Sequence, residues 1–240
     1  MQRYLDNDGR LQIWPKKHAD KQAVCEYVAQ KFELDRFYHE REVNEVLKQW
    51  HTFSDWPLLR RELVERGLMT RNRDGTEYKR IPGLIDTWAD ERIRVRGIVD
   101  ADYDSAIALI NHAFTYQDKH KGGPRTDREQ FTERVVKSPF YVFLHGDQIV
   151  GTVYVQIKGK DLHFGLLTLA DYLRGSDNGK KIIAAIYALG KVLGCHAISL
   201  DYLDIAPWLK KYYESHGFHE TGLREEWLDM QMIEMKRPLQ

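Results

Sequence analysis

Residues 166–181 read LLTLADYLRGSDNGKK and decide the fold of the larger part of this chain. An apolar strand leads into a short polar loop with two glycines, and the loop opens directly onto an amphipathic helix. Such a loop can turn several backbone N–H groups toward one point at the positive end of the helix dipole. Arg174, Lys180 and Lys181 add positive charge there. The segment predicts a site for a pyrophosphate or a similar anion, although glycines before a helix also suit an ordinary turn.

The segments around this loop predict an α+β domain with a mixed sheet over residues 92–240. In order, we expect a strand at 92–99, helices at 103–114 and 127–137, strands at 141–144, 149–157 and 162–169, a helix at 179–193, a strand at 197–202, a helix at 207–215 and a final strand region. Tight glycine turns join the three consecutive strands, which is typical of an antiparallel meander.

Residues 1–80 predict a small helical domain. Three stretches with apolar residues at helical spacing are followed by two short strands around Asn72-Arg73-Asp74-Gly75, which suits a hairpin turn. Three helices and a hairpin follow the order of a winged helix. Residues 81–91 contain one Pro and one Gly and show no sustained period, so we predict a linker there.

The composition is that of an ordinary globular protein. Of 240 residues, 42% are hydrophobic and 30% are charged, and 36 Lys and Arg balance 36 Asp and Glu. A net charge of zero excludes a global field that attracts nucleic acid or an acidic membrane. The longest apolar run, Ile182 to Leu189, is far shorter than the ~20 residues of a membrane span, and Met1–Arg10 lacks a signal-peptide core. With only two cysteines, we expect a cytoplasmic protein without membrane contact.

The glycine loop resembles the coenzyme A pyrophosphate loop of the GNAT N-acetyltransferase family, whose motif is Arg/Gln-x-x-Gly-x-Gly/Ala. The matching residues are Arg174, Gly175, Ser176, Asp177, Asn178 and Gly179, followed by Lys180. Leu169 stands where the family places the strand residue whose backbone bonds the pantetheine arm. The stretch YYESHGF at 212–218 is similar to the family's terminal motif. The resemblance covers about residues 92–225, and it implies the GNAT fold with acetyl-CoA as cosubstrate.

One position departs from the family motif. Asp177 replaces the middle glycine and places a carboxylate where an anionic pyrophosphate would approach. The carboxylate would repel the phosphates unless it turns to solvent or pairs with Lys180 or Lys181. The sequence therefore leaves two outcomes open, a loop that binds coenzyme A and a loop that binds it weakly or not at all.

The resemblance also implies roles in direct transfer of an acetyl group to an amine. Backbone N–H groups near Leu167 and Leu169 would hold the developing oxyanion. Tyr213 matches the family's acid for the departing sulfur, and His163 lies at the strand position that often holds a base. Each has a plain alternative, because Tyr213 also suits a core position and His163 a solvated strand. Asp201 follows on the next strand and could orient an amine, but we assign it no role.

The acceptor is expected to be a small-molecule or peptide amine, and the sequence does not identify it. Phe114–Gln117, with the loop to Gly123, lies where this family usually builds its acceptor pocket. We predict no metal, because Cys-x-x-Cys is missing and His216 and His219 do not share a helical face. The oligomeric state, a homodimer included, is left open.

The N-terminal part is similar to a small bacterial domain of uncharacterised function that occurs fused to regulators and to acetyltransferases. The likeness lies in YLD at 4–6, GR at 9–10, WP at 14–15, EVN at 42–44, LRRELV at 59–64 and GL at 67–68. Its 16 basic and 14 acidic residues are too balanced for a strong DNA-binding module. Locally, however, the third helix and hairpin gather Arg60, Arg61, Arg66, Arg71, Arg73, Lys79 and Arg80. The alternative function is a DNA-binding regulator whose GNAT-like domain senses a ligand, and we favour the enzyme.

Overall fold

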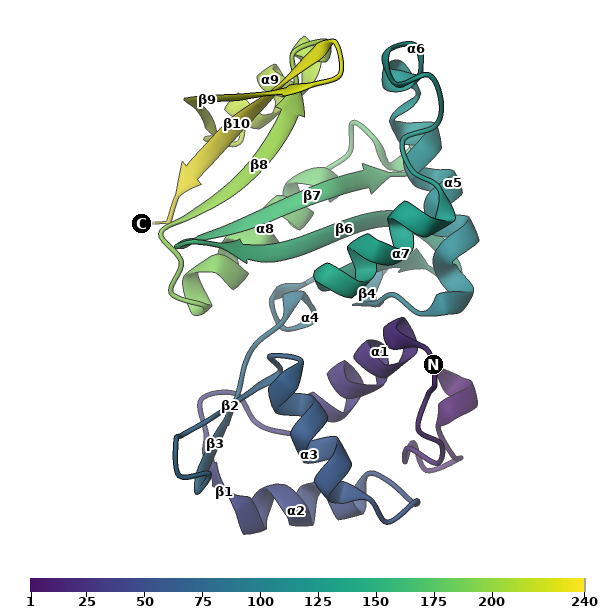
Figure 1. Ribbon diagram of the computed structural model, residues 1–240, viewed down its shortest axis with the longest axis vertical. Helices are drawn as coiled ribbons and strands as arrows, with labels where there is room; N and C mark the ends of the chain where they lie inside the picture. The colour runs from purple at the N-terminus through teal and green to yellow at the C-terminus, as the bar shows by residue number, and fades with distance from the viewer. Residues whose placement is uncertain (240) are drawn as a thin grey trace. The chain divides into compact units, whose positions relative to one another are not determined.

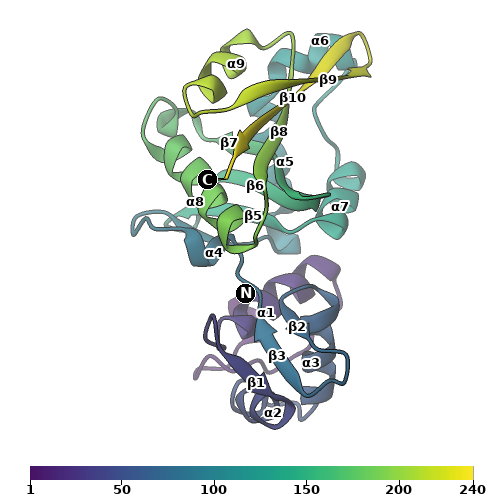
Figure 2. The same ribbon diagram turned by 90° about the vertical axis from the view of Figure 1, so that its left-hand side faces the viewer.

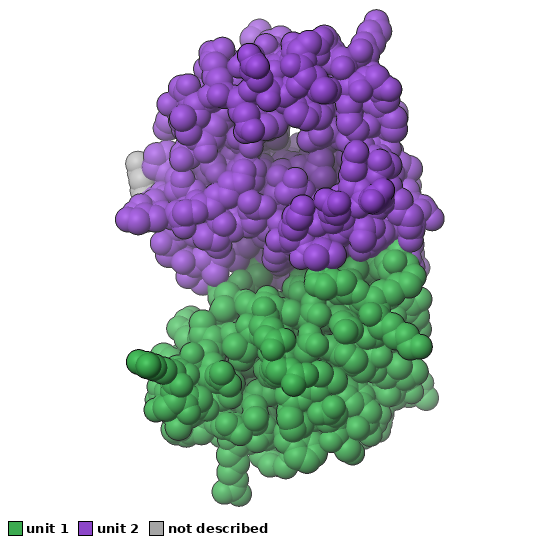
Figure 3. Space-filling model, viewed as in Figure 1, with its two compact units in different colours: residues 1–83, 97–100 green, residues 84–96, 101–240 purple. Residues whose placement is uncertain are grey.

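The computed structural model describes residues 1–239 and divides the chain into two compact units. The first comprises residues 1–83 and 97–100, and the second comprises 84–96 and 101–240 (Figure 3). The division falls between Gly83 and Leu84, inside the segment predicted as a linker.

The first unit has three helices and a small sheet. Its elements are η1 (Gln2–Tyr4), α1 (His18–Ala29), β1 (Phe37–His39), α2 (Glu40–Gln49), α3 (Trp56–Glu65), β2 (Met69–Arg71) and β3 (Glu77–Arg80). The three predicted helices and the hairpin are present. Asp55 caps α3 by accepting a hydrogen bond from the N–H of Leu58 at 3.1 Å, as its sequence predicts. Strand β1 was not predicted; it completes an antiparallel sheet of order β1-β3-β2.

The second unit is built on a seven-stranded sheet. Its elements are α4 (Leu84–Thr87), β4 (Arg94–Gly97), η2 (Asp100–Asp102), α5 (Tyr103–Ala113), η3 (Thr115–Gln117), α6 (Asp118–Lys121), α7 (Arg128–Lys137), β5 (Phe140–His145), β6 (Gln148–Lys158), β7 (Asp161–Leu169), η4 (Asp171–Leu173), α8 (Asn178–Val192), β8 (Ala197–Leu203), α9 (Pro207–Glu214), β9 (His219–Trp227) and β10 (Met230–Pro238). The order and type of the predicted elements are confirmed, and the final strand region is the hairpin of β9 and β10.

The strand order is β4-β5-β6-β7-β8-β10-β9. The meander of β5, β6 and β7 is antiparallel as predicted, whereas β7 and β8 are parallel, so the sheet is mixed. Helix α8 covers one face of this sheet, and α5 and α7 cover the other (Figures 1 and 2). The apolar stripe of α8 that the sequence predicted is buried in the core between these layers.

Most of the segment predicted as a linker packs into the second unit. Leu84 is fully buried in its core, and Trp88 contacts the ring of Phe143 at a centroid distance of 5.0 Å. The carboxylate of Asp90 forms an ion pair with Lys181 at 2.5 Å. Helix α4 has only four residues, which is too short for a helical period to show in the sequence.

The feature that opens the sheet is the divergence of β7 from β8. Strand β7 is paired with β6 from Asp161 to Leu169, but with β8 only at Leu162 and His163 (Figure 1). The pairing of β6 and β7 also shifts register between Thr152 and Tyr154. Opposite this bulge, Leu166 has a φ of 48°, a backbone conformation that non-glycine residues rarely adopt. The backbone N–H and C=O groups on the β8 side of β7 beyond His163 are therefore available to hydrogen-bond to another partner.

Candidate active site

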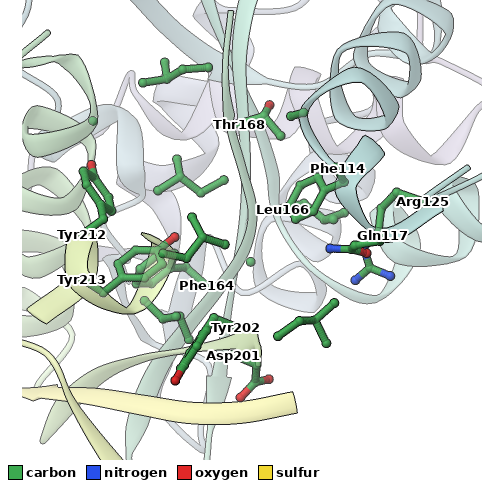
Figure 4. A pocket seen from close by; sticks show the side chains of 18 of the residues that line it. Phe114, Gln117, Arg125, Phe164, Leu166, Thr168, Asp201, Tyr202, Tyr212 and Tyr213 are labelled. Carbon is green, nitrogen blue, oxygen red and sulfur yellow. The ribbon is translucent and has the colours of Figure 1, made fainter. Parts of the chain in front are cut away.

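A cavity of about 1260 Å³ lies within the second unit, where β7 and β8 diverge (Figures 3 and 4). One part is lined by the end of β7, the loop 171–177, the start of α8 and helix α9. The other part is lined by residues 112–117, by the segment that leads into α7, and by side chains of β8 and β9. The predicted loop, the predicted tyrosine and the predicted acceptor stretch thus share one cavity.

The start of α8 offers unpaired backbone donors to this cavity. Gly175 has a φ of 73°, which turns the chain sharply before the helix and favours glycine. Within residues 1–239, the Asp177 side chain does not cap α8, and Ser176 Oγ accepts a hydrogen bond from the Asn178 N–H at 3.4 Å. The N–H of Lys181 donates to the Asp177 carbonyl at 2.9 Å. The first-turn N–H groups of a helix have no carbonyl partner within it, so those of Gly179 and Lys180 can bind an anion.

Asp177 takes an ordinary helical conformation, with a φ of −67°. Glycine is therefore not required there for the path of the backbone, and the departure from the family motif concerns the side chain. The carboxylate is exposed at the rim of the cavity. Among residues 1–239 it has no ion pair with Lys180 or Lys181, since Lys181 pairs with Asp90. Of the two arrangements that the sequence left open, the solvent-facing one is present.

Arg174 folds back onto the end of β7. Its Nε donates to the carbonyl of Leu169 at 3.1 Å, and its guanidinium pairs with Asp171 at 2.9 Å. His112 holds the same aspartate at 2.7 Å. Leu167 and Leu169, whose backbone was predicted to contact the cosubstrate, both line the cavity. A ligand that hydrogen-bonds to the Leu169 carbonyl would share it with Arg174 or displace this side chain.

Gly179 lies against a side chain of α9. A Cβ atom at this position would lie 2.3 Å from the hydroxyl oxygen of Tyr212. Cβ contacts are essentially never this short, so any other residue would force the Tyr212 side chain to shift. The absence of a side chain also leaves the first turn of α8 open to a ligand. Ser176 and Asn178 complete this turn, because the Asn178 amide donates to the Ser176 hydroxyl at 2.7 Å.

Tyr213, the residue predicted as the acid, lies on α9 and lines the cavity. Its ring packs against Phe164 and Phe218, with centroid distances of 6.3 Å and 5.7 Å. Figure 4 shows its hydroxyl pointing into the cavity from the side of α9. Burial raises the pKa of Tyr213 above its ordinary value. The hydroxyl therefore stays protonated at neutral pH and can donate a proton.

His163 is buried, not solvated. Its Nδ1 lies 3.2 Å from the Ser199 hydroxyl, and its Nε2 lies 3.6 Å from Asp201 Oδ2. Burial, and then the nearby charges led by Lys158, lower its pKa to about 3. The ring stays neutral, and a group with so low a pKa is a weak base near neutral pH. These surroundings do not favour the predicted role of His163 as the general base.

Asp201 is the acidic residue that the sequence left without a role. It lies on β8 beyond the last pair with β7, so its side chain lines the cavity (Figure 4). Burial raises its pKa above the ordinary value, and the side chain keeps 28% of its surface exposed. A carboxylate with a raised pKa is a better proton acceptor. No sequence signal distinguished this aspartate, because its access to the cavity depends on where β7 and β8, which are far apart in the sequence, separate.

The basic surface predicted for DNA in the first unit is largely neutralised by its own carboxylates. The ion pairs are Arg60 with Glu40, Arg61 with Glu65, Arg66 with Glu62, and Lys79 with Asp35. Arg80 is buried and donates to the carbonyl of Phe32 at 3.2 Å. The geometry adds no support for DNA binding, which stays a prediction.

Within residues 1–239, no group of three or more His, Cys, Asp or Glu side chains could hold a metal ion. No helix in this described part is long and apolar enough to cross a membrane.

Comparisons with known proteins support the resemblance predicted for the N-terminal part and the fold predicted for the second unit. Residues 10–80 match a family of bacterial proteins described as uncharacterised, DUF2087. This match confirms the N-terminal resemblance. No curated protein sequence matches the chain.

Solved structures resemble the second unit. A protein from Streptococcus mutans UA159 superposes with a TM-score of 0.53 at 16% identity, covering 61% of this chain and 99% of that one. A proposed phosphinothricin N-acetyltransferase gives a TM-score of 0.50 at 16% identity, covering 62% and 99%. A GNAT-family acetyltransferase from Staphylococcus aureus Mu50 gives 0.49 at 17% identity, covering 62% and 99%. The second unit has the mixed-sheet fold of the GNAT acyl-CoA N-acyltransferases, as predicted.

Proposed function

We propose that the chain is an N-acetyltransferase that moves an acetyl group from acetyl-CoA to an amine. The observation that carries this proposal is the start of α8, where Gly179 and Lys180 line the cavity, beside the open edge of β7. The start of α8 can bind the diphosphate of coenzyme A, and the edge of β7 can hydrogen-bond to its pantetheine arm. Gly175 and Gly179 provide the turn and the open helix start that this binding needs.

When bound, acetyl-CoA supplies a thioester whose carbonyl carbon an amine nitrogen can attack. We assign backbone N–H groups at the bulge around Leu167, which lines the cavity, to stabilise the negative charge that develops on the carbonyl oxygen. Tyr213 donates its hydroxyl proton to the sulfur as the carbon–sulfur bond breaks. Asp201 accepts the proton that the amine nitrogen loses, so Asp201 replaces His163 as the proposed base. Nitrogen gains the acetyl group, and free thiol leaves.

Calorimetric titration with acetyl-CoA tests the proposal. We expect binding with a dissociation constant in about the 1 µM to 1 mM range usual for enzyme substrates. Gly179→Asp should weaken binding more than about tenfold, because it places a carboxylate at the anion site and crowds Tyr212.

The matched control is Gly123→Asp, since this glycine has a negative φ and open space around its Cβ position. It should bind acetyl-CoA like the unchanged protein, and thermal unfolding of all three proteins checks that they are folded. Absence of heat with the unchanged protein at millimolar acetyl-CoA would contradict the proposal.

The Asp177 carboxylate is expected to weaken acetyl-CoA binding without preventing it. Both Asp177→Asn and Asp177→Gly should tighten binding about 3–10-fold at low salt, and less at high salt, because each removes a negative charge near the phosphates. The two variants should agree because residue 177 needs no glycine conformation. Tightening by glycine alone would show that the side chain obstructs through its size and that its charge has no effect.

A further inference from the structure

Two arginine side chains lie at the acceptor part of the cavity without a carboxylate partner. Arg125 precedes α7, Arg134 lies on α7, and both line the cavity. The guanidinium of Arg125 lies over the ring of Trp227 at 4.8 Å, and that of Arg134 lies over the ring of Tyr154 at 4.6 Å. Within the described chain, neither guanidinium has an ion pair. Aromatic contacts hold the two cations in place and leave their charge uncompensated.

The environment of Arg125 is costly for an unpaired cation. Burial lowers its pKa, and the positive charge of Arg134 lowers it further. Its Nε is buried without a hydrogen-bond partner, and so is Oε1 of Gln117. Figure 4 shows Gln117 and Arg125 next to each other on one wall of the cavity. Buried polar groups are usually paired, so the Nε donor of Arg125 indicates a ligand that supplies an acceptor, whereas Oε1 of Gln117 would take a donor.

Two carboxylates lie on another wall of the same cavity. Asp201 extends from β8, with Lys158 Nζ 3.8 Å from its Oδ2, and Glu225 contributes from β9. Figure 4 shows Asp201 on β8, apart from Gln117 and Arg125. A single small molecule with one cationic and one anionic group would match both sides. A polyamine or an aminoglycoside would bring further positive charge toward two unpaired guanidiniums and be repelled.

We propose, on the basis of the acetyl transfer proposed above, that the acceptor is a small amine that also carries a carboxylate or comparable oxyanion, as in an α-amino acid. Arg125 and Arg134 bind the oxyanion, and Asp201 faces the amine that is acetylated. Guanidinium groups suit this role because their N–H donors match the two oxygens of a carboxylate. Tyr116 and Trp208, whose ring centroids lie 5.3 Å apart, supply an aromatic surface for the rest of the molecule.

Matched pairs of amines test the proposal. Each α-amino acid of a panel is compared with the amine that lacks only its carboxylate, and thiol release is followed with acetyl-CoA at saturation. We expect the carboxylated member of the best pair to have a kcat/KM about 10–100-fold higher, the range that charge-assisted hydrogen bonds provide. Arg125→Gln should raise KM for this amino acid by a similar factor and leave KM for the decarboxylated amine within about twofold.

The control variant is Arg128→Gln, which removes a neighbouring arginine that pairs with Asp104 outside the cavity. It should leave the preference unchanged. Calorimetry with acetyl-CoA is run on every protein, so that failure of coenzyme binding is separated from failure of acceptor recognition. In protein that binds acetyl-CoA, equal turnover of both members of each pair would overturn the proposal. Lack of turnover with every carboxylated amine would overturn it as well.

Discussion

Tyr213→Phe is expected to lower kcat about 10²–10⁴-fold, the range that general acid catalysis contributes. The variant keeps the ring that packs against Phe164 and Phe218, so the fold and the cavity wall are preserved. It removes the proton that the departing sulfur needs. Steady-state kinetics with thiol detection should show the fall in kcat, while calorimetry should show acetyl-CoA affinity within a few fold of the unchanged protein.

Two further variants make this result specific. Tyr172→Phe removes a hydroxyl from an exposed tyrosine that does not line the cavity, and it should leave kcat unchanged. Tyr212→Phe removes the hydroxyl that lies against Gly179 at the start of α8. It should therefore change the affinity for acetyl-CoA more than it changes kcat. If Tyr212→Phe abolished kcat and Tyr213→Phe did not, the acid would be the neighbouring residue on α9.

Asp201→Asn is expected to lower kcat about 10²-fold and to change its pH dependence. A base acts in its deprotonated form, so kcat should rise with pH through the pKa of Asp201. Because burial raises this pKa, the acidic limb should lie above the ordinary value of about 4 for an aspartate. The asparagine variant has no such group, and the limb should be lost from its pH profile.

Two other positions show whether this limb belongs to Asp201. Asp204→Asn changes the nearby carboxylate, which accepts a hydrogen bond from the N–H of Gln231 at 3.1 Å and does not line the cavity. It should keep the limb. His163→Gln should keep it too, because a histidine with a pKa of about 3 does not titrate in this range. Loss of the limb in His163→Gln, with its survival in Asp201→Asn, would restore His163 as the base.

Local chemistry explains which parts of the fold were predictable. The loop before α8 combines a glycine at positive φ with a helix start, and both leave a signature within six residues. Helices α5, α7 and α8 show their apolar period, and the meander shows its turns. Elements of three or four residues, such as β1 and α4, are too short to show a period, so only packing reveals them.

The site divides in the same way. Tyr213 and the loop 174–179 were located from neighbouring residues in the sequence, and the cavity brings them together. The burial of His163 was missed, because alternation along a strand does not tell which strand covers it from the side. Asp201, Arg125 and Arg134 were given no role. Whether a charged side chain has an ion-pair partner depends on the folded structure, and the sequence does not show it.

The sequence by itself determined the order of the elements, the glycine turn before α8 and the tyrosine on α9, since each depends on hydrogen bonds and conformations within a few residues. The tertiary structure decided the access to these groups. Strands β7 and β8 pair at Leu162 and His163 and then diverge. The pairing covers His163, which lines the cavity with only 2% of its side chain exposed, and the divergence gives Asp201 access to the cavity. Such an arrangement depends on contacts between residues more than thirty positions apart, for example His163 with Ser199, which local patterns do not record.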